Sequence, residues 1–134
     1  MSEDVKYPSI EQALKLYDQI VKATGGERGY LSKSNLEYIL DSVKDIGERL
    51  PRKRAIVKKT SFLLYNVIVI HPFLNGNKRT SFGLAELFLE ANGYRLSAGT
   101  AETYRFLLRV ASGDASELEV ESWVGRNLAD LKRE

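Results

Sequence analysis

The sequence predicts an all-α protein, and three observations lead to that prediction. Apolar residues recur at helical spacing along most of the chain. Two pairs, Ser9 with Gln12 and Ser34 with Glu37, have the spacing of capping boxes at helix starts. Glycine-containing stretches break the periodic segments. The chain has 134 residues, 43% hydrophobic and 28% charged, so we expect a single soluble domain over residues 1–134.

The predicted helices follow one another with short breaks. Pro51 suits a first helical position, and the segment after it becomes apolar on every side, which is typical of a buried helix. Gly93 is a helix stop, and a short extended link over residues 94–96 follows it. The last helix places Val120, Trp123, Val124, Leu128 and Leu131 on one face. The expected helices run from Ser9 to the Gly25-Gly26 pair, from Ser34 through Val43, and over about 52–70, 77–92, 100–111 and 119–132.

Composition excludes several classes of function. The absence of cysteine rules out disulfides and thiolate metal sites. The longest apolar run, residues 62–70, is too short to cross a bilayer, and the acidic start of the chain lacks the features of a secretory signal, so we expect a cytoplasmic protein without membrane contact. The net charge of +2 does not favour direct nucleic-acid binding. A basic cluster at residues 52–59 is interpreted as a solvated helix face.

Residues 71–79 read His-Pro-Phe-Leu-Asn-Gly-Asn-Lys-Arg and contain the only histidine of the chain. Pro72 disfavours helix at the residue before it, so the third helix should end at or near His71. Gly76 allows a sharp turn, and a new helix should begin at Asn77. Lys78 in its first turn adds positive charge to unpaired N–H groups and to the positive end of the helix dipole. Because helix N-termini bind phosphate, we predict an anion site with a histidine at its rim.

This motif, continued by Thr80, resembles the core motif of the Fic/Doc family, in its death-on-curing (Doc) branch. Lys78 stands where the Fic branch has a glycine. The segments 25–30 and 90–94 also fit that branch. The resemblance implies a Fic-type helical bundle with a small flap near the site, and Phe73 plugged into the core to fix the motif loop.

The resemblance also implies an activity, the transfer of phosphate from a nucleoside triphosphate such as ATP to a Ser or Thr hydroxyl of a protein. His71 would be the general base, and Gly76, Asn77, Lys78 and Arg79 would bind the nucleotide. Most members carry an acid at Asn75 that helps to hold Mg²⁺, so metal binding here should be weak. A Doc-like toxin would be inhibited by a small antitoxin protein and would act on a target similar to elongation factor Tu.

Two alternatives stay open. The first is AMP transfer to protein hydroxyls, which is the chemistry of the Fic branch. The second is a catalytically weakened module that binds nucleotide and partner proteins, which the missing charge at Asn75 would favour. The resemblance also places the flap that pairs with a target peptide at Tyr30, Leu31 and Ser32. For these three residues an ordinary surface loop is an equally good interpretation.

Overall fold

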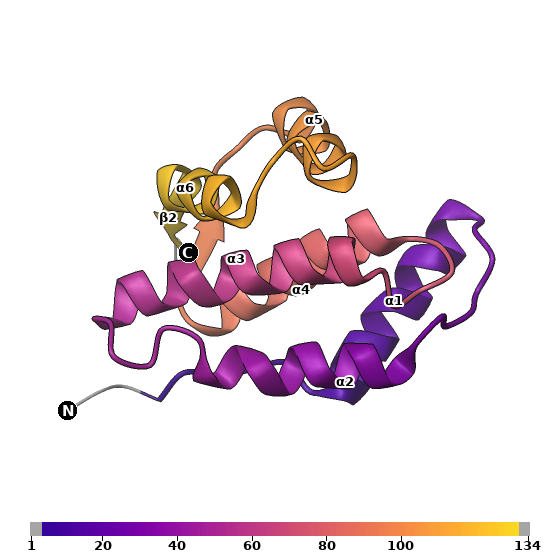
Figure 1. Cartoon of the computed structure of the whole chain (residues 1–134), viewed down its shortest axis with the longest axis horizontal. Coiled ribbons are helices and arrows are strands. Elements are labelled where there is room, and N and C mark those ends of the chain that lie inside the picture. Colours follow the sequence, from indigo (N-terminus) through magenta and orange to yellow (C-terminus); the bar gives the residue numbers. More distant parts are fainter. Residues whose placement is uncertain (1–3, 132–134) are drawn as a thin grey trace.

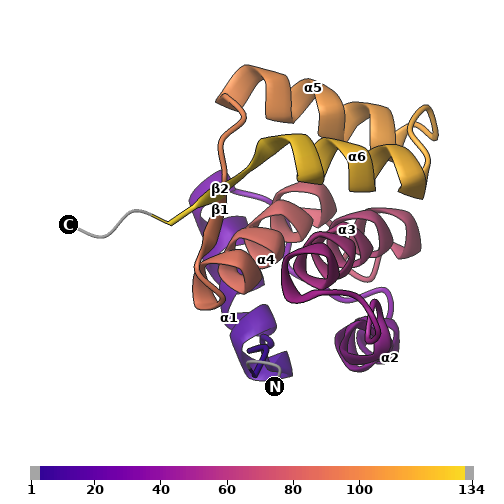
Figure 2. The same cartoon turned by 90° about the vertical axis from the view of Figure 1, so that its left-hand side faces the viewer.

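The helices are stacked in three layers. The computed structural model describes residues 4–131, and in that range it has six α-helices, one 3-10 turn and two short strands. Figures 1 and 2 show α3 and α4 side by side in the middle, with α1 and α2 on one side and α5 and α6 on the other. The predicted all-α class is therefore confirmed. The elements are α1 (Ile10–Thr24), α2 (Lys33–Ser42), η1 (Val43–Asp45), α3 (Arg52–Ile70), α4 (Asn77–Ala91), β1 (Tyr94–Leu96), α5 (Thr100–Ala111), α6 (Glu117–Asn127) and β2 (Leu128–Asp130).

The first helix begins and ends as predicted. Ser9 forms a complete capping box with Gln12, since each side chain accepts a hydrogen bond from the other residue's backbone N–H. At the other end Gly25 adopts the left-handed conformation, with φ at 74°, and its N–H bonds to the carbonyl of Val21. A glycine is needed there because other residues are strained at positive φ.

The predicted start of α2 is wrong by two residues. Ser32, not Ser34, is the N-cap, and its side chain accepts a hydrogen bond from the N–H of Asn35 at 3.1 Å. Ser32 can act as the cap because its backbone is still extended, with φ at −157° and ψ at 99°. Its N–H is held by the carbonyl of Pro72 at 3.0 Å, so a distant contact selects which serine begins the helix.

The C-terminal part of the prediction is also wrong. The last helix starts earlier than predicted, with a capping box between Ser116 and Glu119, and it ends at Asn127 rather than near Lys132, which lies outside the described residues. Leu128 and the two residues after it form β2, which pairs antiparallel with β1. The expected link at residues 94–96 is thus a strand, and Leu128 and Leu131 do not continue the apolar face of α6. Their spacing in the sequence is that of a helix face, and the strand depends on the pairing with β1.

Two hydrophobic clusters share the central helices. The larger one joins α1 and α2 to α3 and α4, and its largest fully buried side chains include Tyr17, Phe73 and Phe88. The second joins α5 and α6 to the opposite side of α3 and α4, around the stacked rings of Phe106 and Trp123 at 4.5 Å. Because α3 and α4 contribute to both clusters, the six helices form one domain.

None of the helices within residues 4–131 has both the length and the apolar character that crossing a membrane requires.

Candidate functional site

The site lies at the turn between α3 and α4, where the two central helices meet. His71 is the C-cap of α3, as the sequence predicts, and its N–H bonds to the carbonyl of Val67 at 3.2 Å. Its backbone is left-handed, with φ at 60° and ψ at 57°, and no other non-glycine residue in the described range has a positive φ. A left-handed L-residue costs about 1–2 kcal/mol, so the fold holds this histidine in a strained conformation.

Phe73 anchors the turn in the core. Its side chain is fully buried and stacks on Tyr17, with ring centroids 4.1 Å apart and planes 8° from parallel. The amide of Asn77 holds the backbone of Phe73 at both ends, because its Oδ1 accepts from the N–H at 3.0 Å and its Nδ2 donates to the carbonyl at 2.9 Å. The Asn77 side chain therefore holds the turn together, and the residue is almost completely buried.

The first turn of α4 presents backbone donors. Gly76 is the N-cap, with φ at 78°, and its carbonyl accepts the first helical hydrogen bond from the N–H of Thr80. The N–H groups of Asn77, Lys78 and Arg79 precede that bond, and no side chain caps them. This is the geometry that binds anions at a helix N-terminus, and here the adjacent side chains are cationic.

Three cavities meet around the turn. A central cavity of about 260 Å³ has His71 and Lys78 in its wall. Lys78 also lines a neighbouring cavity of about 330 Å³. His71 also lines a larger one of about 710 Å³ on the other side. The other lining residues are Ile68, Leu74, Asn75, Gly76, Asn77 and Ala111 in the central cavity, and Thr24, Gly76, Asn77, Arg79, Tyr104 and Leu107 in the neighbouring one.

Charge distinguishes the cavities. Neither the central nor the 330 Å³ cavity has an acidic residue in its described wall. The 710 Å³ cavity has Asp114 and Glu119. The hydrogen bond from the Ser116 N–H, then the contact with Arg109, lower the pKa of Glu119, so this carboxylate is ionised at neutral pH. Phosphate groups are therefore favoured on the side of Lys78 and Arg79, whereas the 710 Å³ cavity has carboxylates in its wall, one of them paired with Arg109 at 3.0 Å.

Asn75 is exposed, lines the central cavity, and donates a hydrogen bond from Nδ2 to the carbonyl of Glu27 at 3.3 Å. Its Oδ1, the one oxygen of the amide, accepts no hydrogen bond among the described residues. No group of three His, Cys, Asp or Glu side chains that could hold a metal occurs among the described residues. These donors fit Mg²⁺ only as the companion of a triphosphate, with the phosphates supplying most of the charged oxygens.

The flap residues Tyr30, Leu31 and Ser32 lie against the turn. Tyr30 forms an isolated antiparallel bridge with Phe73. The N–H groups of Leu31 and Ser32 both bond to the carbonyl of Pro72, at 2.9 and 3.0 Å. The structure thus brings the two predicted segments together, although they are some forty residues apart in the chain. Sequence reasoning missed Tyr17, whose only signal was its place in the apolar face of α1.

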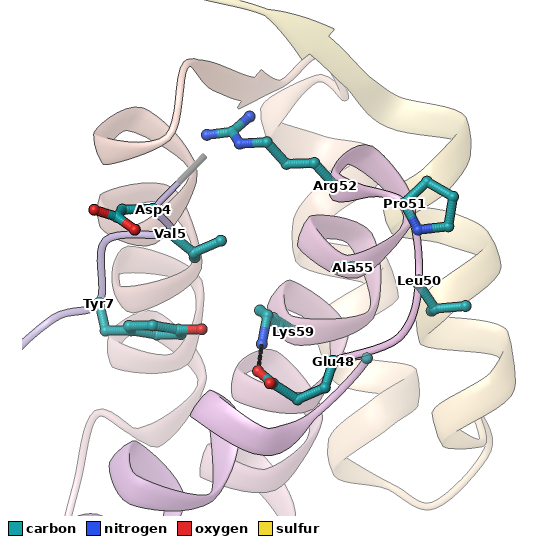
Figure 3. A pocket seen from close by; sticks show the side chains of 10 residues that line it. Asp4, Val5, Tyr7, Glu48, Leu50, Pro51, Arg52, Ala55 and Lys59 are labelled. Carbon is teal, nitrogen blue, oxygen red and sulfur yellow. Dashed lines mark ion pairs between the residues drawn. The ribbon is translucent and has the colours of Figure 1, made fainter. Parts of the chain in front are cut away.

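A separate cavity of about 570 Å³ lies at the opposite end of α3. Figure 3 shows Lys59 directed at Glu48 there, with Tyr7 facing it across the cavity. Lys59 is 2% exposed, so the interpretation of the whole basic cluster as a solvated face is wrong at this residue. Its Nζ donates to the carbonyls of Val43 and Lys44, at 3.2 and 3.1 Å, and so satisfies the C-terminal end of the α2–η1 segment. The aliphatic part of the Lys59 side chain extends into the interior because α3 packs against the α2–η1 segment.

The other cation of this cavity has a similar role. Arg52 donates from Nη2 to the carbonyl of Asn92 at 3.2 Å, at the end of α4, and its guanidinium lies 5.9 Å from the centroid of the Tyr94 ring. Both cations therefore serve helix ends. We interpret this cavity as part of the scaffold rather than as a reaction site.

Comparison with known proteins identifies the family of this chain. The model of the Fic/DOC family matches residues 7–89, which include α1, the flap, α3, the turn and most of α4. The chain belongs to the Fic/DOC family. The Fic/DOC match therefore confirms the family resemblance, whereas membership of the Doc branch stays a prediction.

The chain is also similar to a protein of Sinorhizobium fredii (strain NBRC 101917 / NGR234) that is named probable protein adenylyltransferase y4lH. It is 34% identical over 83 residues, which cover 60% of this chain and 43% of that protein. The chain thus matches less than half the length of this relative.

Proposed function

We propose that this chain transfers a nucleotide-derived group from a nucleoside triphosphate to a hydroxyl group of a protein, and that the group is AMP. Support for the reaction class comes from one observation above all. His71, Asn77 and Lys78 line the same cavity, and the latter two belong to the first α4 turn, whose N–H groups no side chain caps, so a proton acceptor lies beside a candidate phosphate site. Support for AMP comes from the name of the relative, a probable protein adenylyltransferase.

In this reaction the imidazole of His71 removes the proton of the target hydroxyl. The hydroxyl oxygen then forms a bond to the α-phosphorus of ATP, and the bond from that phosphorus to the bridging oxygen of the β-phosphate breaks. Pyrophosphate leaves with the bonding electron pair. Histidine suits this role because its ring can take up and release a proton near neutral pH.

The positive groups would bind the phosphates through the reaction. The N–H groups of Asn77, Lys78 and Arg79 provide fixed dipoles, and two of these residues add side-chain cations, which favour the charge that develops on the phosphate oxygens. Mg²⁺ bound with the nucleotide would neutralise part of the phosphate charge, and Asn75 Oδ1 would hold it weakly.

Phosphate transfer remains the second candidate, and Lys78 is the observation that favours it. In the family resemblance, lysine at this position goes with attack on the γ-phosphorus and departure of ADP. The same His71 and the same phosphate site would serve, with the nucleotide bound in another register. The small antitoxin and the target similar to elongation factor Tu belong to this second proposal.

One experiment distinguishes the two. The purified chain is incubated with a cell extract and with ATP labelled at either the α- or the γ-phosphate, and protein-bound label is measured. Label from the α-position only supports AMP transfer, and label from the γ-position only means phosphate transfer. His71→Ala is the control and should lose label by about 100-fold or more while it still binds ATP. Equal labelling by this variant would contradict a base at His71.

If ATP binds and neither label is transferred, the chain is the catalytically weakened binding module. That result would overturn the transferase proposal.

A further inference from the structure

Tyr17 lies in the middle of α1 and makes two hydrogen bonds to a single distant residue. Its hydroxyl accepts from the N–H of Gly29 at 2.9 Å and donates to the carbonyl of the same glycine at 3.0 Å. The Tyr17 residue is fully buried. A phenylalanine would fill nearly the same space, so packing alone does not explain the hydroxyl group. A buried hydroxyl is costly unless it is hydrogen-bonded, which suggests that its two hydrogen bonds have a function of their own.

The contacts of Gly29 point to that role. Its carbonyl also accepts a hydrogen bond from the N–H of Leu74 at 2.9 Å, next to the bridge between Tyr30 and Phe73. Tyr17 therefore fixes one end of the short ladder that joins the flap to the turn. Its ring stacks on Phe73 and lies 5.6 Å from the ring of Tyr30, so one side chain contacts both strands of that ladder.

The ladder leaves one edge of the flap open. The bonds of the bridge are made by the neighbours of Tyr30, since the N–H of Leu31 and the carbonyl of Gly29 face the turn. In an antiparallel pair of this kind the N–H and carbonyl of Tyr30 itself point to the opposite side. Within the described residues they have no hydrogen-bond partner, and the residues Tyr30 and Leu31 are 45% and 60% exposed.

We propose that Tyr17 is a positioning residue for the protein target. Its hydroxyl holds residues 29–31 in an extended conformation, with the outer edge of Tyr30 ready to pair with an extended segment of the target. Without these two hydrogen bonds, the glycine-rich loop before the flap, residues 25–29, would have to become ordered when the target binds, and this loss of entropy would weaken binding. The part of this inference that concerns a protein target rests on the proposed function. The part that concerns the order of residues 29–31 does not.

The test compares Tyr17→Phe with Tyr38→Phe, a control at a tyrosine that is 61% exposed on α2. Tyr17→Phe keeps the stacking on Phe73 and loses only the two hydrogen bonds. We expect the KM for the protein target to rise by at least about threefold, the change that the loss of one such bond produces. The KM for ATP and the kcat at saturating target should stay close to the wild-type values, because the phosphate site is untouched.

Amide hydrogen exchange provides a second measurement that needs no activity. In Tyr17→Phe the amides of Leu31, Ser32 and Leu74 should exchange faster than in the wild type, while those in the middle of α3 should not change. Tyr38→Phe should leave both exchange and kinetics unchanged. Thermal unfolding of each variant shows that the assays are made on folded protein.

Three results overturn the inference. They are unchanged exchange at these amides, an unchanged KM for the target, and a parallel loss of affinity for ATP, which would indicate general damage. If the wild type transfers no label at all, the proposed function is wrong. The exchange measurement then decides by itself whether Tyr17 holds the flap.

Discussion

At position 71 the backbone conformation and the proposed chemistry favour different residue types. The left-handed conformation favours glycine, whereas proton transfer requires an imidazole. The strain is maintained because Pro72 and Phe73 are both buried and Asn77 holds the Phe73 backbone from two sides. Strained residues of this kind occur at functional sites, where surrounding contacts determine their conformation.

This conflict predicts that His71→Gly makes the protein more stable and inactive. Glycine removes the left-handed strain but increases the entropy of the unfolded chain, so the net gain in the free energy of unfolding should be roughly 0.5–1 kcal/mol. Urea titration measures the stability, and label transfer from ATP measures the activity. His71→Ala is the control: it should also be inactive, without the gain. A glycine variant less stable than the alanine variant would contradict the strain at this position.

On the scale of single elements, the ends of helices are decided by capping groups and by partners outside the helix. The capping boxes at Ser9 and Ser116 need only residues three positions apart. The end of α6 is different, because the carbonyl of Asn127 accepts the N–H of Ser97 at 2.7 Å and the chain then joins β1. Local patterns therefore predicted helix interiors better than this end.

Two carboxylates predict opposite pH dependence for their helices. Desolvation, and then Glu90 one turn later, raise the pKa of Glu86 on α4. The folded state thus holds this proton more tightly than the unfolded state, so the contribution of Glu86 to stability is lost as pH rises through the window above its ordinary pKa. We expect Glu86→Gln to be more stable than the wild type at neutral pH, with the difference vanishing in acid.

Glu119 on α6 provides the matched comparison. Its lowered pKa means that its contribution is present above the ordinary pKa and is lost as pH falls through the lower folded value. Glu119→Gln should therefore be less stable than the wild type at neutral pH, with a difference that becomes smaller as the pH falls. Urea titrations from about pH 3 to pH 7 cover the ordinary carboxyl pKa. Curves of the same sign for both variants would contradict these assignments.

On the scale of the whole molecule, α3 connects the layers. Its buried side packs against α2, α4 and α6, and it carries the turn with His71 at one end and the cavity of Figure 3 at the other. Lys59 is one of its connections, since the ammonium satisfies the carbonyls of Val43 and Lys44. The neighbouring Lys58 makes a half-exposed ion pair with Glu121 at 3.2 Å.

These adjacent lysines should differ in their effect on stability. Lys59→Met should lower the free energy of unfolding by roughly 1–3 kcal/mol, because it leaves the partly buried carbonyl of Lys44 without its donor, whereas the carbonyl of Val43 keeps its bond from the N–H of Ile46. Lys58→Met should cost about 0–1 kcal/mol, the range of exposed ion pairs. Both variants should bind ATP as the wild type does, since the turn lies at the far end of the helix. Chemical unfolding and ATP titration measure the two effects, and equal losses of stability would refute the buried role of Lys59.

The sequence by itself determined the helical class, most of the helix boundaries and the turn at residues 71–79. Periodicity, capping pairs, Pro72 and Gly76 act within a few residues, so their effects can be deduced without knowing the rest of the chain. It also predicted His71 and Lys78 as site residues, and the structure places both in the wall of the central cavity, while their chemical roles stay a prediction.

Only the tertiary structure decided the contacts between distant segments. The β1–β2 pairing, the burial of Lys59, the choice of Ser32 as a cap and the two bonds from Tyr17 to Gly29 depend on residues at least ten positions away in the chain. Such contacts form when packed helices bring the segments together, and the local pattern contains no signal for them. The hydrogen bonds that join residues 29–32 to the turn are another such contact, whereas the pairing of this segment with a target stays a prediction.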